Sequence, residues 1–241
     1  MSLPREILPG RFYTLTRRCV NRMFLLRPDE QTNNNYLYCL ILAAIRFNIV
    51  IIATCAVSNH HHTNLLDRDG RLPEFVHYFH ALLARCQNCY RGRWEHFWAS
   101  GGPSAVELVA PEDIERAVVY TLTNPVKDFL VEEVTHWPGV NSWSALRADR
   151  ALTATRPQHF FRKRMPARVE LKMTVPAEAG VQKSRLGFVF VTLPHNFSRH
   201  RPMPHATEKN PDRGLFLSRC RATSPVIGRW PPHATSLPPP R

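Results

Sequence analysis

The sequence predicts an α+β fold built on a ferredoxin-like split βαβ sheet, followed by a C-terminal extension. The first observation is the order of elements between residues 11 and 124: strand, helix, strand, strand, helix, strand and a further helix. The second is the continuous apolar, β-branched run IVIIATCAVS (49–58), which is typical of a central buried strand. The third is a composition of 44% hydrophobic and 21% charged residues over 241 residues, which suits a soluble globular domain.

The first half of this pattern holds a strand, a helix and a strand pair. RFYTLTRRCV (11–20) has the β-branched and aromatic content of a strand. NNNYLYCLILAAIRFN (33–48) carries apolar residues densely over four turns and indicates a buried helix. After the strand at 49–58, HHHTNLL extends it or pairs with it as another strand, and DRDGR (67–71) is a turn.

The second half repeats the alternation. LPEFVHYFHALLARCQNCYRG (72–92) predicts an amphipathic helix with a proline in its first turn. SAVELVA (104–110) alternates like a short strand, and PEDIERAVVYTLTN (111–124) predicts a helix that opens with a proline and two acidic residues. We expect this helix to end at Asn124, because the residue before a proline is pushed away from helical geometry.

The excess positive charge lies in the C-terminal part of the chain. The net charge is +13, yet residues 1–141 hold 14 Lys and Arg against 14 Asp and Glu, whereas residues 142–241 hold 18 against 5. The sequence therefore predicts a basic extension over 145–194, with strands at 168–176 and 186–194, that suits a polyanionic partner. Residues 195–241 are rich in Pro, Arg and His without periodicity, and we expect them to be disordered.

No apolar run reaches the roughly 18–20 residues that span a bilayer. The start MSLPREILPGR has no apolar signal-peptide core, so we expect a cytoplasmic protein with reduced cysteines and no membrane partner. Cys86 and Cys89 form a C-x-x-C pair without a second pair at zinc-ribbon spacing. They are more simply explained as residues of an ordinary helix.

Three histidines stand together in AVSNHHHTNLL (56–66). Side chains alternate along an extended strand, so His60 and His62 share one face and His61 points to the other. Two neighbouring imidazoles are half of a divalent-metal site, which oxygen ligands could complete. The alternative is an ordinary polar strand end; a purification tag is excluded because the triplet is internal.

The helix at 111–124 carries a second pair of interest. Tyr120 and Asn124 are four residues apart and lie one above the other on one face. A tyrosine hydroxyl is a possible covalent nucleophile, and an amide oxygen is a possible third metal ligand. The alternative is a half-buried tyrosine at the edge of the core and an asparagine that is favoured at a helix end.

The residues of these motifs and their order along the chain resemble those of the REP-associated tyrosine transposases, which belong to the single-tyrosine HUH, or IS200-like, transposase superfamily. The matching segments are PGRFYTLTRRCVNRMFLLRP, SNHHHTNLL, YTLTNPVKDFLV and WPGVNSW. In the family the histidine segment usually reads P/S-N-H-x-H-L and the helix reads Y-x-x-x-N-P-V. The resemblance covers residues 9–144, the predicted transposase domain, and extends toward RPQHFFRKRMPARVELKMTVP (156–176).

The resemblance implies a role for each matching residue. His60 and His62 match the histidines that bind a divalent cation, Mg²⁺ or Mn²⁺, and Asn124 matches the polar third ligand. Tyr120 matches the nucleophile that attacks a DNA phosphate and keeps a 5′-phosphotyrosine link. The family's substrate is single-stranded DNA beside an imperfect hairpin, which is cleaved and rejoined. A monomer or homodimer associated with the bacterial nucleoid is expected.

Three residues depart from the family pattern. His61 stands at a position that is usually apolar or aromatic, and Thr63 and Asn64 also replace apolar residues. Buried polar side chains cost stability unless they are hydrogen-bonded. The departures leave two other hypotheses open: a hairpin-DNA-binding protein that has lost catalysis, and an unrelated small metalloprotein.

Two groups of basic residues are candidates for DNA contact. Arg17, Arg18 and Arg22 follow the first strand and could touch phosphate, or could simply form a solvated strand end. FFRKRMPAR (160–168) combines two phenylalanines with four cations and is the better candidate for a sequence-tolerant clamp on hairpin phosphates. Its cations are Arg162, Lys163, Arg164 and Arg168.

Overall fold

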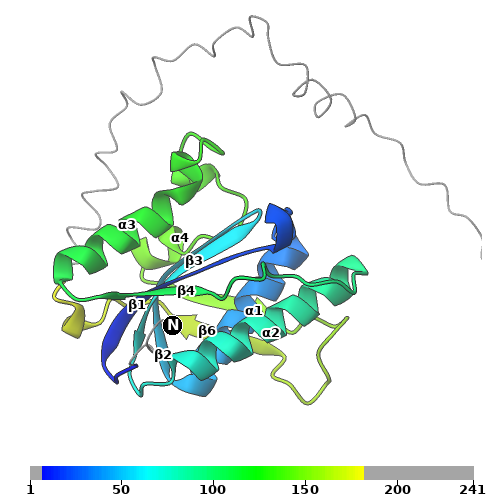
Figure 1. Ribbon diagram of the computed structural model, residues 1–241, viewed down its shortest axis with the longest axis horizontal. Helices are drawn as coiled ribbons and strands as arrows, with labels where there is room; N and C mark the ends of the chain where they lie inside the picture. Colours follow the sequence, from blue (N-terminus) through cyan, green and yellow to red (C-terminus); the bar gives the residue numbers. More distant parts are fainter. Residues whose placement is uncertain (1–6, 182–241) are drawn as a thin grey trace, which may run out of the picture. The chain divides into compact units, whose positions relative to one another are not determined.

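Residues 7–181 are described by the structure, a computed structural model whose centre is a four-stranded antiparallel sheet (Figure 1). The strands are β1 (Arg11–Arg18), β2 (Ile49–Val57), β3 (His60–Asp67) and β4 (Ser104–Leu108). Their order across the sheet is β2-β3-β1-β4, so each helical connection leads to a strand that is not a neighbour. This is the split βαβ topology that the sequence predicts, and the α+β fold class is confirmed.

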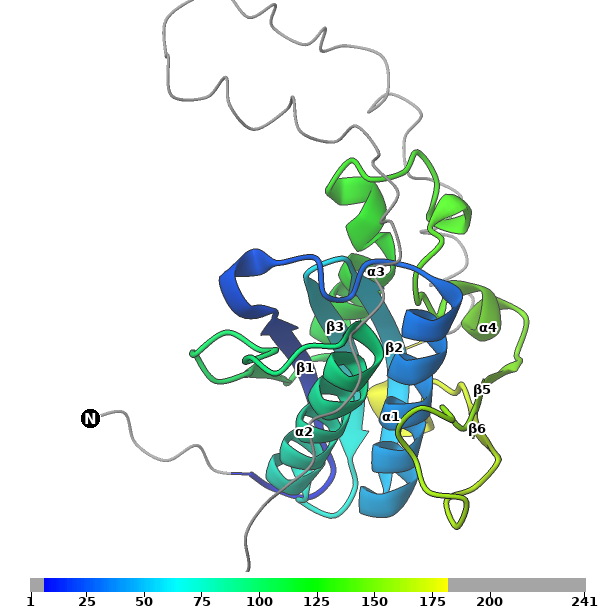
Figure 2. The same ribbon diagram turned by 90° about the vertical axis from the view of Figure 1, so that its right-hand side faces the viewer.

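Three helices cover the two faces of the sheet. α1 (Glu30–Phe47) and α2 (Leu72–Arg91) pack side by side on one face, and α3 (Pro111–Lys127) lies on the other (Figure 2). We call these the paired-helix face and the α3 face. Because strand side chains alternate, each strand contributes every second residue to each face.

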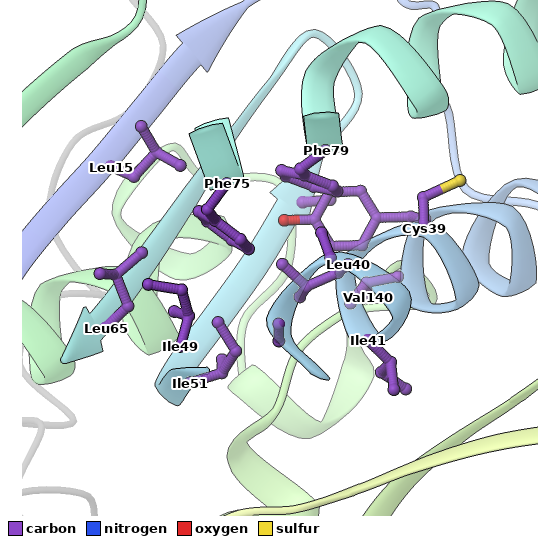
Figure 3. Packing of buried hydrophobic residues seen from close by; sticks show 14 of the residues in the cluster. Leu15, Cys39, Leu40, Ile41, Ile49, Ile51, Leu65, Phe75, Phe79 and Val140 are labelled. Atoms are coloured by element: carbon purple, nitrogen blue, oxygen red, sulfur yellow. The ribbon is translucent and has the colours of Figure 1, made fainter. Parts of the chain in front are cut away.

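The main apolar core lies between the sheet and the paired helices. Leu15 and Leu65 come from the two central strands and lie beside Phe75 and Phe79 of α2, as Figure 3 shows. All four side chains are buried. Burial of one such side chain contributes about 1.5–3 kcal/mol, so this layer fixes the sheet against α1 and α2.

A β-bulge in β2 sets which of its side chains reach the α3 face. The register between β2 and β3 shifts between Ile51 and Ala53, so Ile52 is the extra residue. Beyond the bulge Cys55 pairs with His62, and both then point to the same face. Because of the extra residue, the side chains of β2 after the bulge switch faces, and Cys55 points to the same face as His62.

The expected end of α3 at Asn124 is wrong. The helix runs through Pro125 to Lys127, and the backbone N–H of Asp128 still bonds to the carbonyl of Asn124 at 2.9 Å. Pro125 removes only its own hydrogen bond, in the last turn of the helix, and it is buried. Packing against the sheet therefore outweighs the local preference of the residue before a proline.

The chain beyond α3 adds a small second sheet. α4 (Trp143–Arg147) is followed by β5 (Ala151–Thr155) and β6 (Arg168–Lys172), which pair with each other and pack against α1. The strand expected at 168–176 is present in its first five residues, whereas β5 was not expected. The strand expected at 186–194 and the tail 195–241 lie outside the described residues. Three 3₁₀ turns, at Val20–Arg22, Val134–His136 and Ala177–Ala179, complete the described elements.

No helix within residues 7–181 is long and apolar enough to cross a membrane. The five cysteines in the same range form no disulfide. Four of them are buried, and only Cys89 is exposed.

Candidate active site

His60 and His62 lie side by side on the α3 face of β3. In the strand register they stand opposite Arg18 and Thr16 of β1. Their ring centroids are 4.9 Å apart, with the planes nearly perpendicular at 83°. His61 points to the paired-helix face, where its ring contacts Phe79 of α2.

His62 is buried and keeps a nitrogen without a partner. Its Nδ1 is 2.9 Å from the hydroxyl of Thr16, while its Nε2 is buried and makes no hydrogen bond. Burial, together with the nearby His60 and Arg18, lowers the pKa of His62 to about 4. The ring is therefore neutral at physiological pH, the form in which imidazole binds a metal.

His60 is held by the residue before it. Its Nδ1 is 2.7 Å from the amide oxygen of Asn59, and the Asn59 amide nitrogen donates in turn to the carbonyl of Arg22. An amide oxygen only accepts, so Nδ1 carries the proton and Nε2 keeps its lone pair. Burial lowers the pKa of His60; Asp128 opposes that shift, and Arg18 adds to it. Asn59 thus fixes the orientation of the His60 ring.

Tyr120 and Asn124 bring α3 to the histidines. The Tyr120 ring is 45% exposed and meets the His62 ring edge-on, with centroids 5.4 Å apart. Asn124 is only 1% exposed, and its Oδ1 is buried without a hydrogen-bond partner. One face of α3 therefore presents the accessible phenol of Tyr120 and, four residues later, the buried amide oxygen of Asn124, which has no hydrogen-bond partner.

The ligand atoms fit a divalent cation. Buried polar atoms are normally hydrogen-bonded, so the unpartnered Nε2 of His62 and Oδ1 of Asn124 need an explanation, and a bound cation would supply one. Among residues 7–181 no three His, Cys, Asp or Glu side chains converge on a metal position, so the third protein ligand would be the amide of Asn124. Two imidazole nitrogens and one amide oxygen suit Mn²⁺, Mg²⁺ or Zn²⁺, with oxygens of water or phosphate completing the shell.

The turn of α3 that carries both residues is fixed by one hydrogen bond within the helix and by one from outside it. Thr123 donates its hydroxyl to the carbonyl of Val119 at 2.7 Å. The amide nitrogen of Asn141 donates to the carbonyl of Leu122 at 2.9 Å. Asn141 belongs to the segment WPGVNSW, which packs at the edge of β2. This segment therefore acts on the site indirectly, by fixing where Tyr120 and Asn124 stand.

Each of the three polar residues that depart from the family pattern makes at least one hydrogen bond. His61 Nε2 lies 2.9 Å from His80 Nε2, and Thr63 bonds to the hydroxyls of Tyr36 and Thr54 at 3.2 and 3.0 Å. Asn64 donates to the Thr14 hydroxyl at 2.8 Å, although its Oδ1 is unpaired. The histidine strand is thus regular, and His60 and His62 keep the alternation of an undistorted strand.

The buried pair His61–His80 predicts a loss of stability in mild acid. Burial holds the pKa of each ring well below the ordinary value of about 6.5, so the unfolded chain binds protons that the folded chain does not. Stability is complete above about pH 6.5 and falls as the pH drops below it, by about 1.4 kcal/mol per pH unit for each ring. Urea unfolding between about pH 7.5 and 5.5 measures this dependence.

The double variant His61→Leu with His80→Leu is the control for this prediction. It removes both titrating groups and their mutual hydrogen bond, so its stability is expected to depend less on pH than that of the wild type. His80→Leu alone leaves a buried nitrogen of His61 unpaired and is expected to cost about 1–3 kcal/mol. An unchanged pH slope in the double variant would show that other groups cause the acid sensitivity.

The three candidate arginines at the end of β1 and in the turn after it do not share one face. Arg18 is exposed on the α3 face opposite His60, and Arg22 lies in the following turn, where its carbonyl accepts from Asn59. Arg17 points to the paired-helix face, where its guanidinium lies 5.3 Å from the Trp98 ring centroid and burial lowers its pKa. Arg18 and Arg22 therefore stand at the histidines, and Arg17 does not.

The basic segment 160–168 lies away from the histidines. Arg162, Lys163 and Arg164 are exposed in the loop between β5 and β6, and Arg168 opens β6. This hairpin packs on α1, so the main sheet separates it from α3. Its hypothetical contact with a DNA hairpin stays a prediction, and such a contact would be remote from Tyr120.

Sequence reasoning missed several residues around the site. Thr16, Lys127 and Asn141 each contact a candidate residue or its helix, and none was singled out. Thr16 stands two residues before Arg18 on a predicted strand, but only the register with β3 puts it beside His62. Lys127 lies within the motif-bearing segment YTLTNPVKDFLV, which was the available signal.

Comparison with known proteins gives a fold likeness. No protein-family model and no curated protein sequence matches the chain. Among solved structures, the REP-associated tyrosine transposase bound to a REP hairpin matches at a TM-score of 0.51 and 18% identity, over 67% of this chain and 98% of that one. A candidate transposase from Deinococcus radiodurans R1 matches at a TM-score of 0.36 and 12% identity, over 54% and 95%. The first match establishes that this chain has the REP-associated tyrosine transposase fold.

Proposed function

We propose that this protein is a tyrosine DNA transposase that nicks and rejoins single-stranded DNA beside a hairpin. The observation that carries the proposal is an accessible phenol whose ring meets the His62 ring, on the helix that also carries Asn124. His62 Nε2 and Asn124 Oδ1 are both buried and have no hydrogen-bond partner. The shared fold supports it, because the matching transposase was solved with a REP hairpin bound. A phenol and a cation site beside each other are what a phosphoryl-transfer enzyme with a covalent intermediate needs.

The reaction follows from the nucleophile. The phenol oxygen of Tyr120 forms a bond to phosphorus while the bond from phosphorus to the 3′ oxygen breaks. The 3′ oxygen leaves as a hydroxyl with the proton that the phenol loses, and the 5′ phosphate stays on the tyrosine. Since the phosphodiester energy is conserved in that link, a second 3′ hydroxyl can attack it and rejoin the strand.

The protein residues position the reactants. His60, His62 and Asn124 would hold the divalent cation, Mg²⁺ or Mn²⁺. When bound, this cation would polarise the scissile phosphate and neutralise its charge. Asn59 and Thr16 fix the two imidazoles, and the anchored turn of α3 holds the phenol within reach. Arg18, exposed on the same face, is suited to bind the flanking phosphate.

The substrate strand would have to be single. The phenol is half-exposed at the surface of α3, and an in-line attack requires an accessible backbone phosphate. The exposed cations of 162–168 sit apart from that surface and would contact a separate part of the DNA, such as a hairpin stem. Their contribution would appear in the salt dependence of binding rather than in the chemical step.

A hairpin-DNA-binding protein that has lost catalysis is the second candidate. It was motivated by the polar residues His61, Thr63 and Asn64. All three have hydrogen-bond partners and leave the strand regular, so they give no structural reason for a displaced histidine pair. The intact arrangement favours the active enzyme.

The test uses hairpin-forming single-stranded oligonucleotides that cover both flanks of the native gene. One set carries a 5′ label and the other a 3′ label, and each is incubated with the full-length protein and Mn²⁺. A denaturing gel is expected to show a covalent adduct that contains the 3′ label, together with a 5′-labelled fragment that ends in a 3′ hydroxyl. Tight hairpin binding without any adduct would instead identify the binding protein, and absence of both would contradict a DNA function.

A further inference from the structure

The Tyr120 ring is held between two groups. The His62 ring meets it edge-on, and the ammonium group of Lys127 lies over its face, 4.4 Å from the ring centroid. Lys127 is the last residue of α3, two turns beyond Tyr120, so its side chain reaches back along the helix. An ammonium at this distance is attracted by the ring quadrupole, and the contact restrains an otherwise half-exposed side chain.

Lys127 is also the available cation at this ring. The hollow beside Tyr120 is lined by Glu112, Glu115, Arg116 and Lys127. Arg116 is engaged, since it forms an ion pair with Asp113 at 2.6 Å. Within residues 7–181 Lys127 makes no ion pair with an acidic group, and its ammonium group lies over the Tyr120 ring.

We propose that Lys127 is a positioning residue for the nucleophile: its ammonium holds the Tyr120 ring against His62 in the orientation for attack. This inference rests on the proposed function. A cation over the ring face restricts rotation of the phenol without covering its hydroxyl. The entropic cost of orienting the phenol for attack is then partly overcome before DNA binds. The effect acts on the chemical step and not on DNA affinity.

Three variants test the proposal: Lys127→Met, which keeps the stem without the charge; Lys127→Arg, which keeps a cation over the ring; and Lys172→Met, which removes an exposed lysine on β6. Adduct formation is followed at saturating hairpin oligonucleotide, with oligonucleotide binding measured separately. Lys127→Met is expected to slow the adduct rate about tenfold, with affinity changed less than about threefold. Lys127→Arg is expected to restore most of the rate, and Lys172→Met to leave it unchanged.

Fluorine NMR of 3-fluorotyrosine-labelled protein gives a readout without DNA. The signal missing from Tyr120→Phe identifies Tyr120 among the six tyrosines. This signal is expected to shift and narrow in Lys127→Met, as the ring gains freedom, and to stay close to wild type in Lys127→Arg. A lysine that merely complements the C-terminal dipole of α3 would change neither this signal nor the saturated rate.

The outcomes separate the two proposals. A wild-type rate and an unchanged fluorine signal in Lys127→Met would overturn the positioning role while leaving the transposase in place. Equal loss in Lys127→Met and Lys172→Met would also overturn it, because any lost charge would then have the same effect. No adduct from the wild type would reject the proposed function itself, and the role of Lys127 with it.

Discussion

Tyr120→Phe is expected to reduce adduct formation at least about a thousandfold, to the background of the assay. The substitution removes one hydroxyl, which would be the atom that bonds to phosphorus. Within residues 7–181 that hydroxyl has no hydrogen-bond partner, and the ring is 45% exposed, so the fold loses nothing with it. The melting temperature and the affinity for the hairpin oligonucleotide are expected to stay within about 2 °C and about twofold of the wild type.

Tyr90→Phe is the matched control for this experiment. Tyr90 lies on α2 and is 40% exposed, nearly the same as Tyr120, but it stands on the paired-helix face of the sheet. Its replacement is expected to leave the adduct unchanged. An adduct that persists in Tyr120→Phe would assign the nucleophile to another side chain and would contradict the proposed role of α3.

The pairing of Tyr120 with Asn124, and of His60 with His62, could be predicted from the sequence because each depends on one element's periodicity. Residues four apart in a helix lie on one face, and so do residues two apart in a strand. The contact between the two pairs depends on where α3 packs on β2 and β3. That placement is set by the whole fold and cannot be predicted from either element alone. For the same reason the contact between Thr16 and His62 follows only from the strand register.

The partner of His61 shows a similar limit. His80 belongs to an expected helix, and a polar residue on its buried side was a visible signal. A hydrogen bond between the two rings, however, requires a particular placement of α2 over β3. Sequence alone could state that His61 needs a partner, and could not name it.

The errors at element ends have local causes. α1 begins at Glu30, three residues before the expected start, because Asp29 caps it by accepting from the Thr32 backbone at 2.6 Å. The sequence Pro28-Asp29-Glu30 contains the signal for this cap, but the expected start was placed at residue 33, where the apolar periodicity begins. β5 was missed because five residues of modest strand preference form a strand only by pairing with β6.

Removal of a proposed cation ligand is expected to abolish the stabilisation of the protein by Mn²⁺. Mn²⁺ that binds only the folded protein should raise its free energy of unfolding by about 2.7 kcal/mol at a hundredfold excess over the dissociation constant. His62→Ala and Asn124→Leu are each expected to abolish this increase, because each removes one of the two unpartnered ligand atoms. Thermal or urea unfolding with and without Mn²⁺ measures it, and His136→Ala, at an exposed histidine, is expected to behave as wild type.

The same variants should differ in the absence of metal, and this difference tests the site independently of DNA. Asn124 Oδ1 is buried without a partner, which costs about 1–3 kcal/mol, and a leucine of similar shape removes that cost. Asn124→Leu is therefore expected to unfold at the wild-type urea concentration or above it without Mn²⁺. His62→Ala loses the Thr16 contact and leaves a cavity, so it is expected to be less stable. Marked destabilisation by Asn124→Leu would mean that Asn124 supports the fold and would remove the main reason for placing a cation there. A stable variant that no longer responds to Mn²⁺ would show that the asparagine is retained for the cation and not for the fold.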